Sequence, residues 1–155
     1  MEATGTFKPL FSRELAKLEK EIGSYTSEKK IWTTTEGISN SAGNLALHLA
    51  GNLSHFVGNI IGETGYQRNR EAEFTDKDLS KSRLLEIIDD TKKAVESSLE
   101  KLNDADLDKP YPVRVFDYDM STRYFLIHLL AHLSYHLGQI NYHRRMLDHV
   151  HEPIA

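Results

Sequence analysis

The stretch Leu130-Ala-His-Leu-Ser-Tyr-His-Leu-Gly-Gln139 decides how we expect this chain to fold. In and next to it, histidine recurs every four residues, at His128, His132 and His136. Residues four apart lie on one face of an α-helix, so these imidazoles should line one side of a long helix that we predict from Ser121 to Leu147. The same face carries apolar residues, which indicates that it looks inward: Phe125, Leu129, Ile140 and Leu147.

Composition is typical of one globular domain, and we predict a single domain over residues 1–155. The chain is 39% hydrophobic and 27% charged, with a net charge of −4. Because this balance builds no basic face, nucleic acid is not an expected partner. No apolar run approaches the roughly 20 residues that span a bilayer, so we expect no membrane association. Cysteine is absent and the N-terminus lacks a signal-peptide pattern, which favours a cytoplasmic location.

Three earlier segments show the apolar spacing of amphipathic helices. They span Phe7 to Tyr25, Ser41 to Ile61 and Lys81 to Leu102. Ser80 and Ser121 are suited to cap the third and fourth helices, because a serine side chain accepts a hydrogen bond from the first helical turn. We predict loops in the segments that lack a helical period: Ser27 to Gly37, Tyr66 to Asp78 and Asn103 to Asp119. Four long amphipathic helices predict an all-α four-helix bundle.

Three glycines lie in the second predicted helix, at Gly51, Gly58 and Gly62. A glycine inside a helix costs about 1 kcal/mol relative to alanine, so three of them in one helix need a reason. We interpret them as places where a neighbouring helix approaches closely.

Two histidines four residues apart on a helix can bind one metal ion. A third ligand must come from elsewhere, because two turns, about 12 Å of rise, separate His128 from His136. His48 is the best candidate, since it lies on the inward face of the second predicted helix. His48, His132 and His136 would leave open positions on the ion, which is typical of catalytic sites. We expect a divalent ion, zinc or nickel first and manganese or iron as alternatives.

Two motifs resemble those of the DinB-like (DinB/YfiT) superfamily. One is His48-Leu-Ala-Gly-Asn-Leu in the second predicted helix, and the other is His132-xxx-His136-x-Gly-Gln139 in the last. Two longer segments resemble one branch of that superfamily: Asn40 to His48 and Gly65 to Phe74. The resemblance covers the chain from the first predicted helix to Leu147. It implies a four-helix bundle, a divalent metal held by the helix-two histidine and the H-x-x-x-H pair, and a homodimer.

The resemblance also implies metal-assisted chemistry on a small-molecule substrate. Relatives include transferases and isomerases that use mycothiol or bacillithiol, and metal-dependent hydrolases. We therefore expect a metal-dependent hydrolase or an S-transferase for a low-molecular-weight thiol, with metal-bound water or thiol as nucleophile. Two alternatives stay open: a metal-binding bundle without catalysis, linked to stress or to ligand binding, and a histidine-rich bundle without metal. The chain lacks the E-x-x-H, H-E-x-x-H and G-x-S-x-G motifs of other enzyme classes.

The other histidines have weaker patterns. His128 lies one turn from His132, and we expect it beside the site rather than on the metal. His55 is expected to be structural or solvent-facing, and His143 to form hydrogen bonds within the bundle. His149 and His151 are expected to be surface groups of a polar tail.

Polar neighbours add candidates for supporting roles. Asn52 and Gln139 face the right way to accept a hydrogen bond from a metal-bound histidine, although polar packing within the bundle explains them equally well. The loop after the second predicted helix offers charged and aromatic groups that could meet the open side of the metal, although we favour a solvated loop: Glu63, Tyr66, Arg68, Arg70 and Glu73. No residue is assigned a catalytic role from the sequence.

Overall fold

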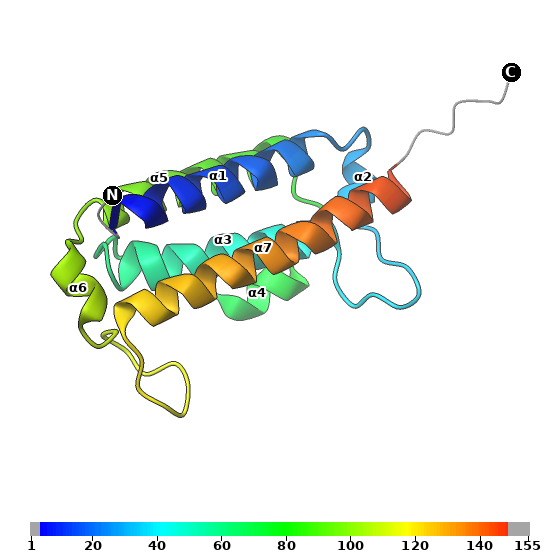
Figure 1. Cartoon of the computed structure of the whole chain (residues 1–155). Coiled ribbons are helices and arrows are strands. Elements are labelled where there is room, and N and C mark those ends of the chain that lie inside the picture. The colour runs from blue at the N-terminus through cyan, green and yellow to red at the C-terminus, as the bar shows by residue number, and fades with distance from the viewer. Residues whose placement is uncertain (1–3, 149–155) are drawn as a thin grey trace, which may run out of the picture.

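The computed structural model describes residues 4–148. Four long helical elements pack as a bundle, which confirms the predicted all-α fold (Figure 1). They are α1 (Thr4–Gly23), α3 (Ala42–Leu53) with its π-helical continuation η1 (Ser54–Asn59), α5 (Lys81–Leu99) and α7 (Thr122–Leu147). Ser80 and Ser121 cap α5 and α7 as predicted, each accepting a hydrogen bond from the backbone N–H three residues later.

The connections hold three short helices, so the prediction of plain loops was wrong there. They are α2 (Glu28–Ile31), α4 (Arg70–Thr75) and α6 (Asp104–Asp108). Helices this short contain too few turns to show an apolar period, and local caps begin them instead. Asn69 accepts a hydrogen bond from the backbone N–H of Ala72 at the start of α4, and Asn103 shares a reciprocal capping box with Asp106 at the start of α6.

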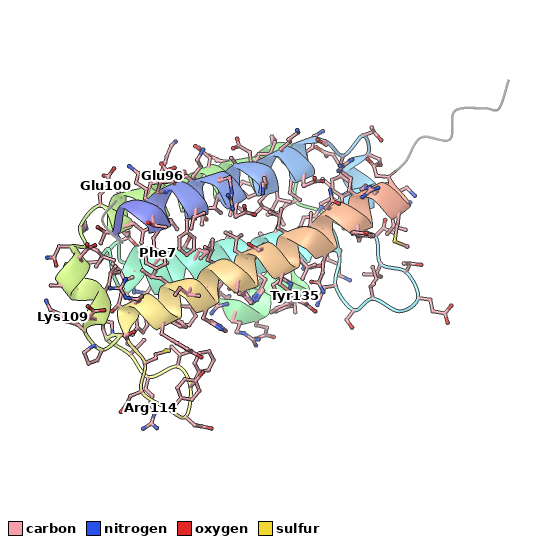
Figure 2. The ribbon with its side chains drawn as sticks, viewed as in Figure 1. Phe7, Glu96, Glu100, Lys109, Arg114 and Tyr135 are labelled. Atoms are coloured by element: carbon pink, nitrogen blue, oxygen red, sulfur yellow. The ribbon has the colours of Figure 1, made fainter. Side chains whose placement is uncertain are left out.

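Contacts between side chains fix the directions of the long helices. α1 runs antiparallel to α5, since Ser12 bonds to Glu96 while Lys8 bonds to Glu100. Figure 2 shows Glu96 and Glu100 beside the first turns of α1. α3 and η1 run parallel to α5, because successive contacts advance along both: Ser54 with Thr91, Gly58 with Ala94, and Gly62 with Ser98. A parallel pair needs a long return connection. Residues 60–80 supply it, and they carry α4 back against α3.

One apolar core fills the space between the helices. Burying a large apolar side chain stabilises the fold by about 1.5–3 kcal/mol. The largest fully buried apolar side chains come from every long element of the bundle: Phe11, Leu15, Leu49, Leu84, Ile88 and Phe125. Over the described residues, none of the helices has the length and apolar character needed to cross a membrane.

Candidate metal centre

α3 and α7 bring His48, His132 and His136 together. One ring nitrogen from each lies within 4.8 Å of the other two, and the Nε2 atoms of His48 and His132 are 3.1 Å apart. The rings of His132 and His136 are nearly perpendicular, with centroids 4.6 Å apart. His48 is buried and the other two are half-buried. The structure therefore assembles the three residues that the spacing singled out, and their role as metal ligands remains a prediction.

The donor set fits a divalent ion. A zinc ion holds imidazole nitrogens at about 2.0–2.1 Å, which places two ligands of a tetrahedral ion about 3.4 Å from each other. The 3.1 Å between His48 and His132 is close to that separation. The third nitrogen, within 4.8 Å, needs only a small side-chain adjustment to join them.

Glu73 of α4 sets the tautomer of His48. Its Oε1 lies 3.0 Å from His48 Nδ1 and accepts that proton, which leaves the Nε2 lone pair facing the cluster. Arg68 holds the same carboxylate with two hydrogen bonds of 2.8 Å. Burial alone would raise the pKa of Glu73, but the hydrogen bonds from Arg68 and His48 outweigh it and lower that pKa. Glu73 is therefore an ionised partner of His48.

Gly51 makes the room that Glu73 needs. A Cβ atom at Gly51 would lie 2.2 Å from Glu73 Oε2, which is inside the van der Waals contact distance. The interpretation of the three glycines as close helix approaches fits Gly62, where a Cβ would meet Ser98 of α5. It does not fit Gly58, where the nearest atom, Ala94 Cβ, would be an ordinary 3.5 Å away. At Gly51 the approaching group is a side chain of the metal centre.

Gln139 orients His136 as predicted, with its Oε1 2.7 Å from His136 Nδ1. Asn52 makes no such bond: its Oδ1 and His132 Nδ1 are both buried without a hydrogen-bond partner among the described residues. Burial, with the neighbouring His136 and His48, lowers the pKa of His132 to about 4. Burial also lowers the pKa of His136. Both imidazoles are therefore neutral at physiological pH, the state in which a metal ion binds them.

The remaining histidines lie outside the cluster. His128 is exposed and packs its ring against Phe116 and Phe125, with centroids 5.0 and 5.7 Å away. His143 is buried and bonds to Tyr25 and to the Thr33 carbonyl, the hydrogen bonding within the bundle that we predicted. His55 is partly buried, with no partner on its Nδ1 among the described atoms. The predictions for His149 and His151 lie outside the described residues.

Only two members of the charged loop reach the centre, Arg68 and Glu73. Glu63 is exposed, with a left-handed φ of 57°. Arg70 places its guanidinium over the Phe74 ring, and Tyr66 faces a separate cavity. The part played by Glu73 could not be read from its spacing, because it lies 25 residues from His48 on α4, a helix that we did not predict.

Comparison with solved structures places this architecture among known folds. A DinB-like protein from Bacillus cereus ATCC 10987 superposes with a TM-score of 0.71, covering 94% of this chain and 95% of that chain. The two sequences are 16% identical, so the match shows the fold alone. Comparison with curated proteins gave no match. A family model matches residues 7–152, which include the three histidines of the cluster. The chain therefore belongs to the DinB-like family described as "Protein of unknown function (DUF1572)".

Proposed function

We propose that this protein is a metal-dependent enzyme, a hydrolase or an S-transferase for a low-molecular-weight thiol, with a divalent ion on His48, His132 and His136. The main support is the convergence of three imidazole nitrogens within 4.8 Å, from two helices. Zinc and nickel suit such a nitrogen set best, with manganese and iron as alternatives. A bound ion with an open position lowers the pKa of the water or thiol placed there, which supplies a nucleophile near neutral pH.

Two neighbouring residues orient the imidazoles for metal binding. Glu73 and Gln139 each accept the Nδ1 proton of one ligand, so the Nε2 lone pairs point inward. Glu73 is a positioning residue and not a general base, because its Oε1 meets His48 and Arg68 while its Oε2 meets Arg68 again. Those hydrogen bonds also lower the pKa of Glu73, which makes its carboxylate a weak acceptor of a substrate proton near neutral pH.

A metal-binding bundle without catalysis is the alternative. The structure favours an enzyme, because His132 and His136 are only half-buried and a cavity of about 500 Å³ adjoins His136. Cavities of roughly 300–1,000 Å³ are the usual size for small-molecule sites. A closed structural ion would need neither feature.

Metal content tests the site directly. We expect about one zinc or nickel ion per chain in metal-replete protein, and loss of most of it in His132→Ala, because three ligands cannot be replaced by two at similar affinity. His128→Ala is the matched control, since His128 is exposed on the same helix and outside the cluster. Equal metal in both variants would overturn the assignment.

Turnover then separates the two functions. The metal-loaded protein should hydrolyse a member of an ester and amide panel, or transfer a low-molecular-weight thiol to an electrophile, and His132→Ala should not. Full metal occupancy with no turnover across both panels would favour the bundle without catalysis.

A further inference from the structure

We propose that the cavity between α7 and residues 35–40 is the substrate pocket of this metal centre, and that it takes an uncharged, flat apolar group such as an aromatic ring. We call it the α7 pocket. This inference rests on the proposed function, which it deepens by naming the class of substrate. The residues that carry the argument lie on its wall: Ile38, Leu45, Tyr135, His136, Tyr142 and Met146.

The α7 pocket adjoins the histidine cluster at His136. His136 lies in its wall together with Gln139, the residue that orients the His136 ring. The other two histidines of the cluster are not part of the wall. A molecule in this pocket therefore approaches the ion from the His136 side, with a reacting group at the ion and the rest of its body along α7.

The wall presents several large side chains that are well exposed. On α7, Tyr135, Tyr142 and Met146 are 66%, 64% and 63% exposed. They share one helical face with Gln139, at intervals of three and four residues. Ile38, 41% exposed, faces them from the loop before α3. Tyrosine rings and a methionine thioether around a hollow suit a flat apolar ligand, because they pack against it with little loss of side-chain freedom.

The charge of the wall excludes a strongly anionic ligand body. Glu36 is a carboxylate in the wall, and the described residues of the wall include no lysine or arginine. Arg145 packs its guanidinium 5.5 Å from the centre of the Tyr142 ring and is not a wall residue. An anionic group desolvated in this pocket would lack a cationic partner and would meet Glu36, which costs free energy. An uncharged group avoids that cost.

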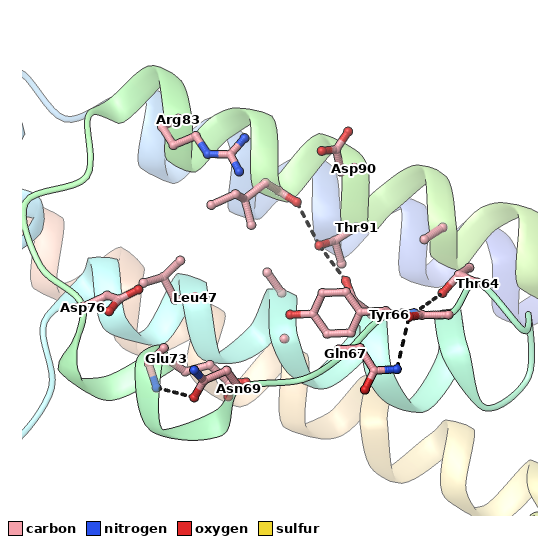
Figure 3. A pocket seen from close by; sticks show the side chains of 17 residues that line it. Leu47, Thr64, Tyr66, Gln67, Asn69, Glu73, Asp76, Arg83, Asp90 and Thr91 are labelled. Atoms are coloured by element: carbon pink, nitrogen blue, oxygen red, sulfur yellow. Dashed lines mark hydrogen bonds between the residues drawn. The ribbon is translucent and has the colours of Figure 1, made fainter.

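A second cavity, about 560 Å³, lies between α3, α5 and the segment before α4, and its chemistry is different (Figure 3). Its lining carries more charged side chains than the α7 pocket, among them Arg83 and Asp90 on α5 and Asp76 just after α4. It touches the metal centre only through Glu73, whose carboxylate is already bonded to His48 and Arg68. A ligand there would not reach the ion, whereas the α7 pocket is lined by one of the proposed metal ligands, His136.

Methyl-labelled methionine gives a readout that needs no metal. The chain has three methionines, of which Met146 lies in the α7 pocket and Met120 is buried before the start of α7. In metal-free protein labelled with [13C-methyl]methionine, benzamide should shift the Met146 resonance saturably and leave Met120 unchanged. Benzoate, of the same shape but charged, should bind about tenfold more weakly, because its carboxylate would be buried without a partner.

Tyrosine variants test where the ring of benzamide binds. Tyr142→Ser should weaken benzamide binding about fivefold, the contribution of one aromatic pair. Tyr124→Ser is the matched control, because Tyr124 is a 49% exposed tyrosine of α7 outside the pocket. An unchanged Met120 resonance in both variants reports that the bundle remains folded.

A second arm links the pocket to the ion. In zinc-loaded protein, benzohydroxamate should bind about tenfold more tightly than acetohydroxamate, since both carry the metal-binding group and only one carries a ring to bury. Tyr142→Ser should remove most of that preference, and Tyr124→Ser should keep it.

The outcomes separate the pocket from the metal. Metal binding without a Met146 response, or benzoate binding as tightly as benzamide, would overturn the α7 pocket and leave the proposed function standing. A Met146 response in a protein that binds no metal would overturn the link to a metal centre. A ring preference that survives Tyr142→Ser would place the ring elsewhere and overturn the proposal.

Discussion

At the scale of single residues, the buried carboxylate of Glu73 fixes the tautomer of His48. Glu73 is almost fully buried, yet Arg68 keeps it ionised through two hydrogen bonds. An ionised partner holds the proton on His48 Nδ1 and raises the basicity of the opposite nitrogen. The Arg68–Glu73–His48 chain of contacts would therefore support the proposed metal binding without contacting the ion.

Replacing Glu73 by glutamine should weaken metal binding about 10- to 100-fold, the usual effect of losing such a partner. The amide oxygen can still accept from His48, but the charge that pairs with Arg68 is gone. Competition with a chromophoric chelator measures the affinity. Glu71→Gln is the control, an exposed glutamate of the same short helix. Equal affinities for wild type and Glu73→Gln would show that the carboxylate plays no part.

Gly51→Ala should disturb the hydrogen bond between Glu73 and His48 from the α3 side. The new methyl group would overlap the Glu73 carboxylate, so either α4 or the side chain must move. We expect a loss of about 1–3 kcal/mol in the free energy of unfolding, as for other overpacked sites, together with weaker metal binding.

Gly58→Ala is its matched control. The added methyl group fits at 3.5 Å from Ala94 and improves helix propensity, so this variant should be as stable as wild type or up to about 1 kcal/mol more stable. Urea unfolding compares the two. Similar free energies of unfolding for both alanine variants would contradict the account of Gly51.

At the scale of elements, the periodicity of α7 was enough to predict the histidine face and the bundle. Contacts between elements were harder to predict, because they depend on how the chain returns. Since α3 and α5 run parallel, residues 60–80 must travel back along the bundle, and that path alone brings Glu73 to His48.

The turn that ends α3 also lacks a pattern that the sequence could reveal. In η1 the backbone N–H of Ile60 donates to the His55 carbonyl and that of Gly62 to Val57, five residues back in each case. Such π-helical turns are rare and leave the apolar spacing of the sequence almost unchanged. The helix that we predicted to Ile61 therefore extends to Asn59, with α-helical hydrogen bonds up to Leu53 and a π-helix from Ser54 to Asn59.

His143 bonds the end of α7 to the segments on both sides of α2, and the stability of this contact should depend on pH. Tyr25 donates its hydroxyl proton to His143 Nδ1 at 2.6 Å, and His143 Nε2 donates to the Thr33 carbonyl at 2.8 Å. Burial lowers the pKa of His143 below its ordinary 6.5, although Thr33 and Asp148 oppose that shift. His143 therefore binds a proton less readily in the folded protein than in the unfolded chain.

Above pH 6.5 His143 is neutral in both states, so it should make no contribution to the pH dependence of the free energy of unfolding there. The free energy of unfolding should fall as the pH drops from 6.5 towards the folded pKa. One such group contributes a slope of at most about 1.4 kcal/mol per pH unit. Urea unfolding of wild type and His143→Gln from about pH 5 to pH 7 tests this. The variant should lose this part of the slope, whereas His128→Gln should keep it. Parallel curves for wild type and His143→Gln would refute it.

At the scale of the whole molecule, a bound ion would join two helices whose ligands lie 84 residues apart. An ion at 100 times its dissociation constant stabilises the folded state by about 2.7 kcal/mol. For a chain of this size that corresponds to a rise in Tm of roughly 5–11 °C. We expect this rise in wild type and His128→Ala, and its absence in His132→Ala and in excess chelator. A Tm that does not change with metal would contradict an ion that bridges α3 and α7.

The most direct test of the central claim is anomalous diffraction from crystals of the zinc-loaded protein, recorded on both sides of the zinc absorption edge. The account predicts one strong peak about 2.0–2.1 Å from a ring nitrogen of each of His48, His132 and His136. A peak elsewhere, or none at this cluster in crystals of metal-replete protein, would contradict it.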